Sequence, residues 1–307
     1  MSNKKVVFMG TPEFSVPALE AIANSSYEVT CVYTQPPKKS NRGQKLNISP
    51  VHKCAKSLKL IIRDPENLNS EEEFDFIKKM NPDIVIVVAY GQLISKKILN
   101  IPKEGFINIH ASLLPKWRGA APIQRSIMNS DTETGISIMK IVEKLDAGPV
   151  MKVIKIKIDD SINTENLSKN LSKIGSESIV KVLDDIFTRK FEFIEQNHKD
   201  ATYAKKITKE EAEINWNDSA KKILAKINGL NSNPGAWFMY KKKRHKIWKA
   251  KIVEKKGVPG KIIDKNFTIA CGYKSLEVME IQKEGKNKLS LKNFLTGTDF
   301  KQGDELK

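Results

Sequence analysis

The sequence predicts an α/β fold, a doubly wound and mainly parallel sheet, followed by a small β-barrel. Short apolar runs alternate with amphipathic segments through the first two thirds of the chain, and one run, Ile84–Val88, contains no polar residue. Such runs are typical of parallel strands that are buried on both faces. Toward the C-terminus the runs become shorter and are separated by Gly and Pro, as in small barrels. We therefore expect two domains, residues 1–189 and 208–307, joined by a linker over residues 190–207.

The first elements follow from hydrophobic periodicity. The expected strands are Val6–Met9, Val29–Tyr33 and Ile84–Val88, and the expected helices are Pro17–Ala23, Val51–Leu58 and Phe74–Met80. Ligands of such a sheet bind beyond the carboxyl ends of its strands. After the first strand, we expect Thr11 to cap a helix that has Pro12 at its first position. This turn is not a GxGxxG motif, so nothing in it indicates a nicotinamide or flavin site.

A polar pair on one face of an expected strand is the most informative feature of the chain. Asn108 and His110 are two residues apart, so if Phe106–His110 is extended, the amide and the imidazole project from the same face. The residues that follow include a hydroxyl, a proline, an arginine and a glycine, which suits a segment held rigid against a ligand. A lone histidine on a strand is more often structural, but these neighbours indicate a chemical site.

Two further strands and a long helix complete the first domain. Gly135–Ile141 and Val150–Ile158 alternate apolar and polar residues, and we expect them to flank a hairpin-like loop that carries Asp146. Asn163–Phe187 is amphipathic at helical spacing and should cover the sheet. The polar residues 188–209 are expected to form a connector with one apolar anchor, at Tyr203–Ala204.

The C-terminal domain is expected to be an OB-like barrel. A helix over Ser219–Asn228 is followed by short strand-like runs separated by turn residues. The runs are Ala236–Tyr240, His245–Val253, Gly260–Ile263, Thr268–Cys271 and Leu276–Ile281. Between the two strands that carry Trp237 and Trp248 lies the basic cluster Lys241–Lys246. Such a cluster can follow a phosphate backbone, although a solvated hairpin in a Lys-rich chain is an equally good interpretation.

The charge is strongly positive and unevenly distributed. The formal net charge is +17, which indicates a polyanionic partner, with nucleic acid as the leading candidate. From Lys205 onward the chain has 24 Lys and Arg against 12 Asp and Glu, whereas residues 1–204 have 29 against 24. The excess therefore belongs to the C-terminal third. A general bias of the composition toward Lys is the alternative explanation.

The spacing of the cysteines and the length of the apolar runs indicate in which cellular compartment the protein works. Cys31, Cys54 and Cys271 are odd in number, widely separated and in no CxxC spacing, so we expect neither a disulfide framework nor a zinc site. The apolar run after the basic N-terminus is too short for a secretory signal, and Ile84–Ala89 is far too short to span a membrane. We expect a cytoplasmic protein that needs no metal.

The residues described above resemble those of the N10-formyltetrahydrofolate-dependent formyltransferases. The resemblance depends on Asn108–His110, on Ser112–Pro115 with Arg118–Arg125, and on Asp146. Other segments are similar to the branch of this family that formylates methionyl-tRNA. These segments are Phe8–Phe14, Gln35–Leu46, Val88–Gly91, Ile214–Trp216, Asn233–Trp237 and Lys246–Ala250. The resemblance covers nearly the whole chain and implies a Rossmann-like catalytic domain, 10-formyltetrahydrofolate as the formyl donor, and methionyl initiator tRNA as the acceptor.

The resemblance implies that Asn108, His110 and Asp146 are the catalytic residues. Attack of an amine on the formyl carbon builds negative charge on an oxygen and positive charge on the nitrogen, so the site needs hydrogen-bond donors and a proton acceptor. We assign the Asn108 amide and the His110 imidazole to that oxygen. A neighbouring carboxylate can make the imidazole cationic. Asp146 would orient His110 and receive the proton, directly or through a water molecule.

The resemblance also implies two loops that contact folate. Backbone groups rather than charges should make most of these contacts, with the second loop forming the wall of the pterin site. The expected folate contacts are Ser112, Leu113, Leu114 and Pro115 from one loop, and Val88, Ala89, Tyr90 and Gly91 from the other.

Two basic segments are the expected contacts of tRNA. Gln35–Lys45 is Pro-rich and basic, which is typical of a surface loop. Arg42 is one of only six arginines in the chain, and Arg suits phosphate and stacked bases better than Lys does. Our hypothesis is that this loop becomes ordered on the acceptor end of tRNA. The expected tRNA contacts are Lys38, Lys39, Arg42, Lys45, Lys241, Lys242, Lys243 and Arg244.

Other functions share part of this pattern. A sugar-nucleotide or glycinamide-ribonucleotide formyltransferase would have the same three catalytic residues, but would not need a basic loop or a basic barrel. A formyltetrahydrofolate hydrolase would also have them, with water as the acceptor. An RNA-binding protein without activity would explain the charge, but not an intact Asn, His and Asp set. We expect a monomer.

Overall fold

The computed structural model describes residues 4–40, 45–298 and 300–306, and the chain forms two compact units. The first unit consists of Met1–Gly119, Gly135–Ile156 and Ser168–Tyr203. The second consists of Ala120–Thr134, Lys157–Leu167 and Ala204–Lys307.

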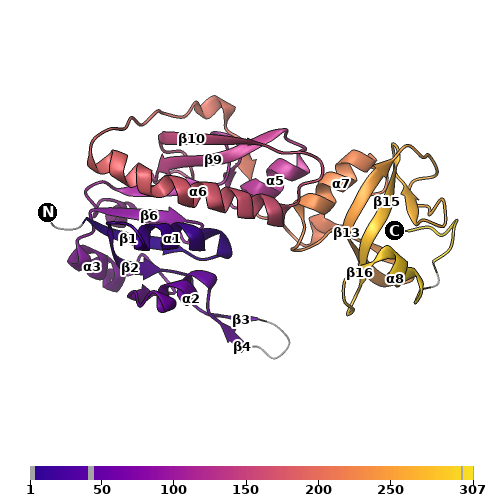
Figure 1. Cartoon of the computed structure of the whole chain (residues 1–307), viewed down its shortest axis with the longest axis horizontal. Coiled ribbons are helices and arrows are strands. Elements are labelled where there is room, and N and C mark those ends of the chain that lie inside the picture. Colours follow the sequence, from indigo (N-terminus) through magenta and orange to yellow (C-terminus); the bar gives the residue numbers. More distant parts are fainter. Residues whose placement is uncertain (1–3, 41–44, 299, 307) are drawn as a thin grey trace. The chain divides into compact units, whose positions relative to one another are not determined.

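A seven-stranded mixed sheet forms the centre of the first unit (Figure 1). Its strand order is β10-β9-β7-β6-β1-β2-β5. The strands from β7 to β5 in this order pair in parallel, whereas β9 is antiparallel to β7. Their bounds are β1 (Lys5–Gly10), β2 (Glu28–Tyr33), β5 (Ile62–Arg63), β6 (Ile84–Val88), β7 (Phe106–His110), β9 (Glu133–Lys140) and β10 (Val150–Lys157). The expected doubly wound and mainly parallel sheet is confirmed.

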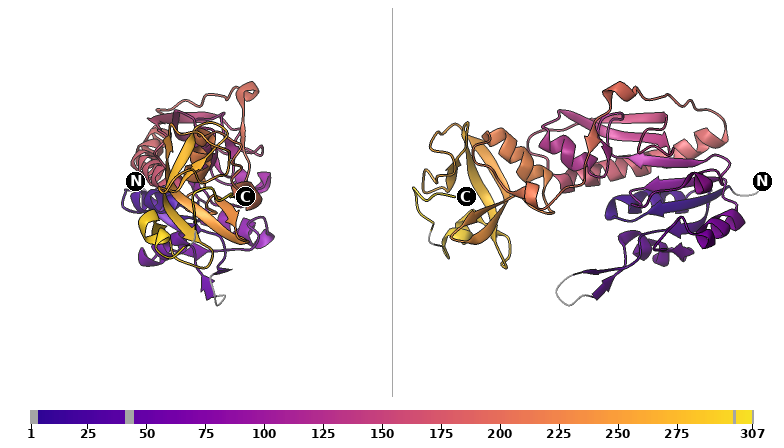
Figure 2. Two further views of the ribbon diagram at one scale, coloured as in Figure 1. Left: turned by 90° about the vertical axis from the view of Figure 1, so that its right-hand side faces the viewer. Right: turned by 180° about the vertical axis from the view of Figure 1, so that it is seen from behind.

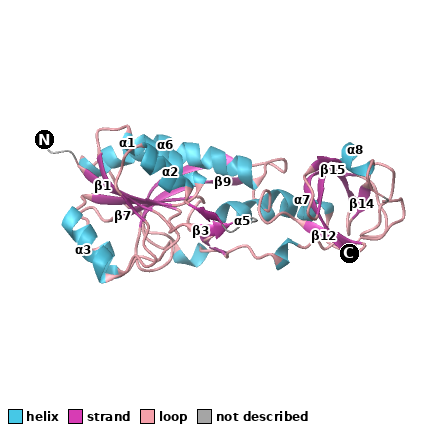
Figure 3. Ribbon diagram, turned by 90° about the horizontal axis from the view of Figure 1, so that it is seen from below, coloured by secondary structure: helices cyan, strands magenta, loops and turns pink. Residues whose placement is uncertain are grey.

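Helices cover both faces of this sheet, with α1 and α6 on one side and α3 on the other (Figure 3). The helices are η1 (Glu13–Ser15), α1 (Val16–Ala23), α2 (Pro50–Ser57), α3 (Glu71–Met80), α4 (Lys96–Leu99) and α6 (Thr164–Phe187). Apolar side chains along α6 such as Leu171 and Ile179 are fully buried, as the amphipathic pattern predicts. Within the described residues, none of the helices has the length and apolarity that crossing a bilayer requires.

The sheet order identifies where a ligand can bind. All five side chains of β6 are buried, as its apolar run predicts. Strand β1 lies between β6 and β2 and pairs with both in parallel, so consecutive strands are added on opposite sides of β1. Doubly wound sheets bind ligands at the carboxyl ends of the strands at such a point. The loops after β1 and β6 meet there.

The expected helix cap at Thr11 is wrong. The 3-10 helix η1 has Pro12 as its N-cap residue, and no side chain caps it. The Thr11 hydroxyl instead donates to the carbonyl oxygen of Tyr90 at 2.8 Å. Ser15, which precedes α1, donates to the carbonyl oxygen of Val88 at 2.6 Å. These two hydroxyls donate to the segment after β6 instead of capping a helix. They hold that segment against the one after β1.

Two short strand pairs lie outside the main sheets. Strands β3 (Lys38–Ser40) and β4 (Lys45–Asn47) are antiparallel, and Arg42 between them lies outside the described residues. Strand β8 (Arg118–Gly119) pairs with β11 (Tyr203–Ala204). Of the expected apolar anchor, Ala204 is buried but Tyr203 is 54% exposed. The segment before it contains the 3-10 helix η2 (His198–Asp200).

The second unit contains a five-stranded antiparallel sheet, consistent with an OB-like barrel. Its order is β12-β13-β15-β14, and β16 also pairs with β15. The strands of this sheet are strongly twisted (Figure 2). The core of the unit includes Phe238, Ile247 and Leu276. The elements are α5 (Pro122–Met128), η3 (Glu210–Ala212), α7 (Ala220–Gly229), β12 (Trp237–Tyr240), β13 (Lys243–Val253), β14 (Thr268–Ala270), β15 (Ser275–Lys283), β16 (Leu289–Ser290) and α8 (Leu291–Leu295).

The strand expected over Gly260–Ile263 is wrong. Lys261 and Ile262 each make a single bridge, to Glu305 and Ile269. Gly260 has φ +83°, which is not a strand conformation. The apolar side chain of Ile262 still enters the core. A pattern of apolar residues therefore located a buried segment here but not a strand.

Candidate active site

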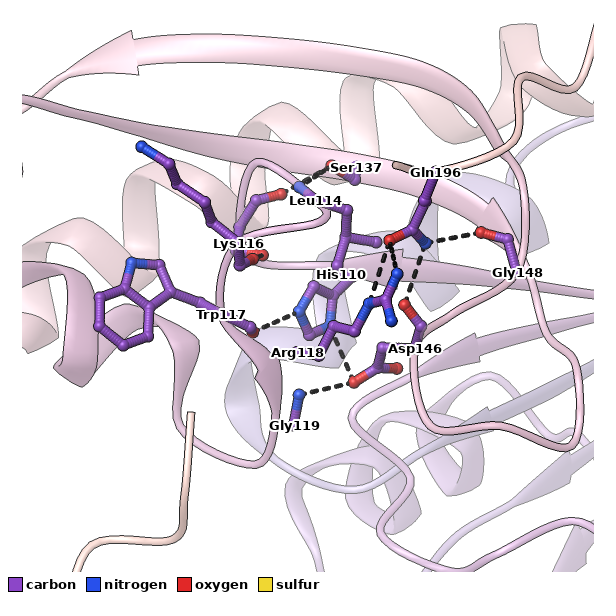
Figure 4. A network of polar contacts seen from close by, with 11 residues as sticks. His110, Leu114, Lys116, Trp117, Arg118, Gly119, Ser137, Asp146, Gly148 and Gln196 are labelled. Atoms are coloured by element: carbon purple, nitrogen blue, oxygen red, sulfur yellow. Dashed lines mark hydrogen bonds and ion pairs between the residues drawn. The ribbon is translucent and has the colours of Figure 1, made fainter. Parts of the chain in front are cut away.

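His110 and Asp146 meet at the carboxyl end of β7. The distance from His110 Nδ1 to Asp146 Oδ2 is 3.7 Å, and the two side chains are only 7% and 15% exposed (Figure 4). Phe106–His110 is a strand, as expected. Asn108 therefore has its side chain on the same face of β7 as His110, and it is partly buried. The sequence placed His110 and Asp146 in one site, and the structure brings them together.

The Asp146 loop is held tightly at the end of the β9–β10 hairpin. The backbone N–H of Gly119 donates to Asp146 Oδ2 at 2.8 Å. Asp146 has φ +46°, a left-handed conformation that Asp tolerates better than most residues. A Cβ atom on Gly148 would lie 2.0 Å from the carbonyl oxygen of Lys140, so only glycine fits. The carboxylate is thus fixed by its own backbone and by Gly119.

Both nitrogens of the His110 ring face oxygen atoms. Nε2 is 3.0 Å from the carbonyl oxygen of Trp117, and Nδ1 faces the Asp146 carboxylate. Of these two contacts, only the one at Nε2 is within hydrogen-bond distance. Trp117 has φ +61°, a conformation that is costly for a bulky residue and is found at functional sites more often than elsewhere. The ring therefore lies between a carbonyl oxygen and a carboxylate oxygen.

The loop after β7 is rigid because a buried serine of β9 anchors it. Ser137 donates from its hydroxyl to the carbonyl oxygen of Ser112 at 2.7 Å and accepts from the N–H of Leu114 at 3.0 Å. Ser112, itself buried, donates to the carbonyl oxygen of Lys116 at 2.6 Å. The Ser112 hydroxyl is thus used inside the loop. The neighbouring residues, Leu113, Leu114 and Pro115, are partly buried.

The loop after β6 presents its backbone at the ligand-binding edge of the sheet. Val88 and Tyr90 are buried, whereas Ala89 and Gly91 are exposed and have φ +48° and +89°. The hydroxyls of Thr11 and Ser15 hold the carbonyl oxygens of Tyr90 and Val88, the residues on either side of Ala89.

Exposed apolar side chains border this edge. Leu93 is 79% exposed and Leu145 is 53% exposed. The two loops that carry them lie side by side, because Lys96 Nζ approaches Glu143 Oε1 to 3.8 Å. Contiguous exposed apolar surface marks binding sites. These side chains therefore make this edge of the sheet a candidate binding surface.

From the sequence alone, Arg118 is named in the motif that carries the resemblance but has no assigned role, and Gln196 is not named. Arg118 is 1% exposed, and its Nε and Nη2 atoms donate to Gln196 Oε1 at 3.1 and 2.6 Å (Figure 4). Gln196 Nε2 donates to the carbonyl oxygens of Asp146 and Gly148. Residue 196 lies in the segment expected to be a connector. An arginine in a chain whose default basic residue is lysine was the available signal for Arg118, and nothing comparable indicated Gln196.

Apart from Arg42, which lies outside the described residues, the basic residues expected to contact tRNA lie on two pairs of antiparallel strands, one in each unit. Lys241 and Lys242 have φ +46° and +62° and form the turn between β12 and β13, as a two-residue hairpin loop requires. Lys243 and Arg244 begin β13, and the Arg244 guanidinium lies 4.2 Å from the centre of the Trp237 ring. Lys38 is exposed on β3. Lys39 belongs to β3 and Lys45 to β4.

Comparison with known families covers both units. The sequence model of the family described as Formyl transferase matches residues 4–183, and that of Formyl transferase, C-terminal domain, matches residues 206–299. A relative named methionyl-tRNA formyltransferase, from Pelagibacter ubique, is 51% identical over 306 residues, which are 99% of this chain and 99% of the relative.

Solved structures share the fold. An N-formyltransferase from Helicobacter canadensis, in complex with folinic acid and dTDP-3-aminofucose, has a TM-score of 0.68 and 18% identity over 90% of this chain and 99% of its own. HypX from Aquifex aeolicus, in complex with tetrahydrofolic acid, has a TM-score of 0.65 and 16% identity over 100% of this chain and 51% of its own. At such identities these likenesses show the fold alone.

Proposed function

The chain belongs to the formyl transferase family, and within it to the methionyl-tRNA formyltransferases, and from this membership we propose how its residues carry out the reaction. It transfers the formyl group of 10-formyltetrahydrofolate to the α-amino group of methionyl initiator tRNA, giving N-formylmethionyl-tRNA for translation initiation. The observation that carries the proposal is the approach of His110 and Asp146 at the end of β7. It lies beside the edge where the fold binds ligands.

The loops after β6 and β7 bind the donor, which supplies the formyl group. Ala89 and Gly91 offer backbone groups to the edge of the pterin, and Val88 and Tyr90 support them from the core. The loop over Ser112–Pro115 closes the other side. Its internal hydrogen bonds through Ser137 support this role, because a preformed loop loses little conformational entropy when a ligand binds.

Asn108 and His110 stabilise the formyl oxygen as the amine attacks. The Asn108 amide projects from the same face of β7 as the imidazole. The described hydrogen bond of the ring is at Nε2, to Trp117, which leaves the Nδ1–H of the imidazolium to donate to the oxygen that gains charge. Donors fixed before the reaction stabilise this charge without reorganisation.

Asp146 has two tasks. Its carboxylate favours the cationic form of His110, and it accepts the proton that the attacking amine must lose, directly or through a water molecule. The 3.7 Å separation from Nδ1 is longer than a hydrogen bond. At this distance the carboxylate can stabilise the positive charge of the ring without taking the Nδ1–H away from the formyl oxygen.

We also propose which role each part of the chain has. Residues 1–189 form the catalytic domain and residues 208–307 a tRNA-binding domain, which agrees with the charge excess of the C-terminal third. Residues 190–207 link the two, although the part of this linker up to Tyr203 belongs to the first compact unit. The enzyme acts as a monomer in the cytoplasm, where aminoacyl-tRNA is made and used. No metal ion takes part.

A direct assay tests the function. Purified protein is given 10-formyltetrahydrofolate with methionyl initiator tRNA, uncharged tRNA, an amino sugar nucleotide, or water alone as the acceptor. Formyl transfer should be found with the charged tRNA and be at least about 10²-fold slower with the others, because they lack the aminoacyl amine or the tRNA contacts. Faster turnover of the amino sugar nucleotide, or release of formate in water, would identify a different formyltransferase or a hydrolase.

The basic segment that contains Arg42 has its own test. Replacing Arg42 with Leu should raise KM for methionyl-tRNA and should reduce the slope of log(kcat/KM) against log[salt] by about 1, because one phosphate contact is lost. Steady-state rates over a range of salt concentrations measure both effects. The matched control is Lys173→Leu on α6, which removes an exposed positive charge far along the chain from both basic segments. If the two variants have the same kcat/KM, the segment that contains Arg42 does not contact tRNA.

A further inference from the structure

The buried guanidinium of Arg118 has no part in the reaction as described above. Arg118 is the largest of the fully buried side chains. Burial of a positive charge is costly unless hydrogen bonds compensate for it. Here the described partners are neutral: Nε and Nη2 donate to Gln196 Oε1, and Nη2 also donates to His198 Nδ1 at 2.9 Å. This charge lies next to the catalytic loop, because its partner Gln196 also donates to the carbonyl oxygens of Asp146 and Gly148.

Arg118 fixes the orientation of the Gln196 amide. Gln196 is only 8% exposed, and its Oε1 atom accepts both guanidinium hydrogen bonds. Since Arg has donors and no acceptor, the amide cannot turn over, and its NH₂ group must point away from Arg118. That group donates to the carbonyl oxygens of Asp146 at 3.0 Å and Gly148 at 2.6 Å (Figure 4).

The Gln196 amide holds the backbone of the catalytic loop at two carbonyl groups, those of Asp146 and Gly148. Asp146 is in the left-handed region, a conformation that persists where neighbouring contacts enforce it. The two carbonyl oxygens held by Gln196 belong to Asp146 itself and to the second residue after it. The carboxylate is held separately, by the N–H of Gly119, which directly follows Arg118. Arg118 and its neighbour therefore control both the backbone and the side chain of Asp146.

We propose that Gln196, locked by Arg118, is a positioning residue for Asp146. This inference depends on the proposed role of Asp146 in catalysis. Gln196 makes no contact with the reacting atoms in this proposal. It keeps the Asp146 carboxylate at a fixed distance from His110 Nδ1. Without this contact the loop that carries Asp146 could shift, and a displacement of about 1 Å can lower turnover about 10²-fold.

The sharpest variant is Gln196→Glu. The new carboxylate keeps, and strengthens, the contact with Arg118, so folding is retained. Its second oxygen, however, faces the carbonyl oxygens of Asp146 and Gly148, where the NH₂ group donated before. We expect kcat to fall about tenfold or more, with KM for both substrates unchanged within about twofold. Steady-state kinetics and a thermal melt of each protein measure this.

A double-mutant cycle distinguishes positioning from general damage. If Gln196 acts through Asp146, the Gln196→Glu change should lower kcat in the natural background but alter it by less than about twofold in an Asp146→Asn background. The second variant, Gln196→Met, removes the amide without adding charge and should give the same pattern. The same fractional loss in both backgrounds would show that Gln196 does not act through Asp146, and would overturn the inference.

A matched control tests whether loss of any buried amide has this effect. Asn231 is also 8% exposed and donates from Nδ2 to the carbonyl oxygen of Trp248 at 2.9 Å. Asn231→Asp should lower the melting temperature but leave kcat unchanged. If Asp146→Asn abolishes activity while Gln196→Glu has no effect, only the inference fails. If Asp146→Asn is fully active, the proposed catalytic role and the inference fail together.

Discussion

Asp146→Asn should lower kcat about 10³-fold, the largest effect of any single substitution proposed for this enzyme. The neutral amide cannot take the proton of the attacking amine, and it no longer favours the cationic imidazolium of His110. Asn tolerates the left-handed backbone at this position, and its amide oxygen can still accept from the N–H of Gly119. The loss should therefore be confined to turnover.

Rates of formyl transfer at saturating concentrations of both substrates measure the Asp146→Asn effect, and KM should stay near its original value. Asp184→Asn is the matched control in the first unit, because its exposed carboxylate accepts a 2.6 Å hydrogen bond from Tyr27. That variant should be fully active. An Asp146→Asn enzyme with nearly normal kcat would show that the proton leaves by another route.

His110→Gln should lower kcat about 10²- to 10³-fold. Glutamine is polar and its NH₂ group can still donate, but from a single nitrogen atom, so the substitution removes the positive charge and the donor at the second ring position. The Trp117 carbonyl group and the Asp146 carboxylate then compete for the remaining amide. We expect binding of both substrates to be preserved, because neither is held by the imidazole in the ground state.

Single-turnover formylation, together with equilibrium binding of tRNA and folate, separates chemistry from binding in His110→Gln. His52→Gln is the control, since His52 approaches Asp64 to 3.4 Å in the same unit and has no proposed role. Full activity of His110→Gln would mean that the developing charge on the formyl oxygen is stabilised by other groups, with Asn108 as the first to examine.

Local pattern predicted the elements that position the site. The alternation of residues over Phe106–His110 predicts a strand with Asn108 and His110 on one face, and the strand is present. The apolar run before Ala89 predicts a strand buried on both faces, and all of its side chains are buried. Such features depend on neighbours in the chain, which a sequence displays directly.

The missed features depend on partners that are distant along the chain. Thr11 was expected to cap a helix, but its hydroxyl bonds Tyr90, 79 residues away. Arg118 and Gln196 are separated by 78 residues, and no periodicity links them. Polar residues in a charge-rich segment are typical of a connector, and nothing local distinguishes a buried glutamine from an exposed one. The local pattern of a sequence cannot predict tertiary hydrogen bonds of this kind.

The dependence of Asp146 on residue 196 affects how the enzyme matures. Chains emerge from the ribosome N-terminus first, at about 5–20 residues per second. The histidine and the aspartate of the site are made early, yet the amide that orients the aspartate is made about fifty residues later. A nascent chain released before that point would carry every reactive group of the site but hold the aspartate loosely. The enzyme therefore becomes active only after translation has passed the end of the first unit.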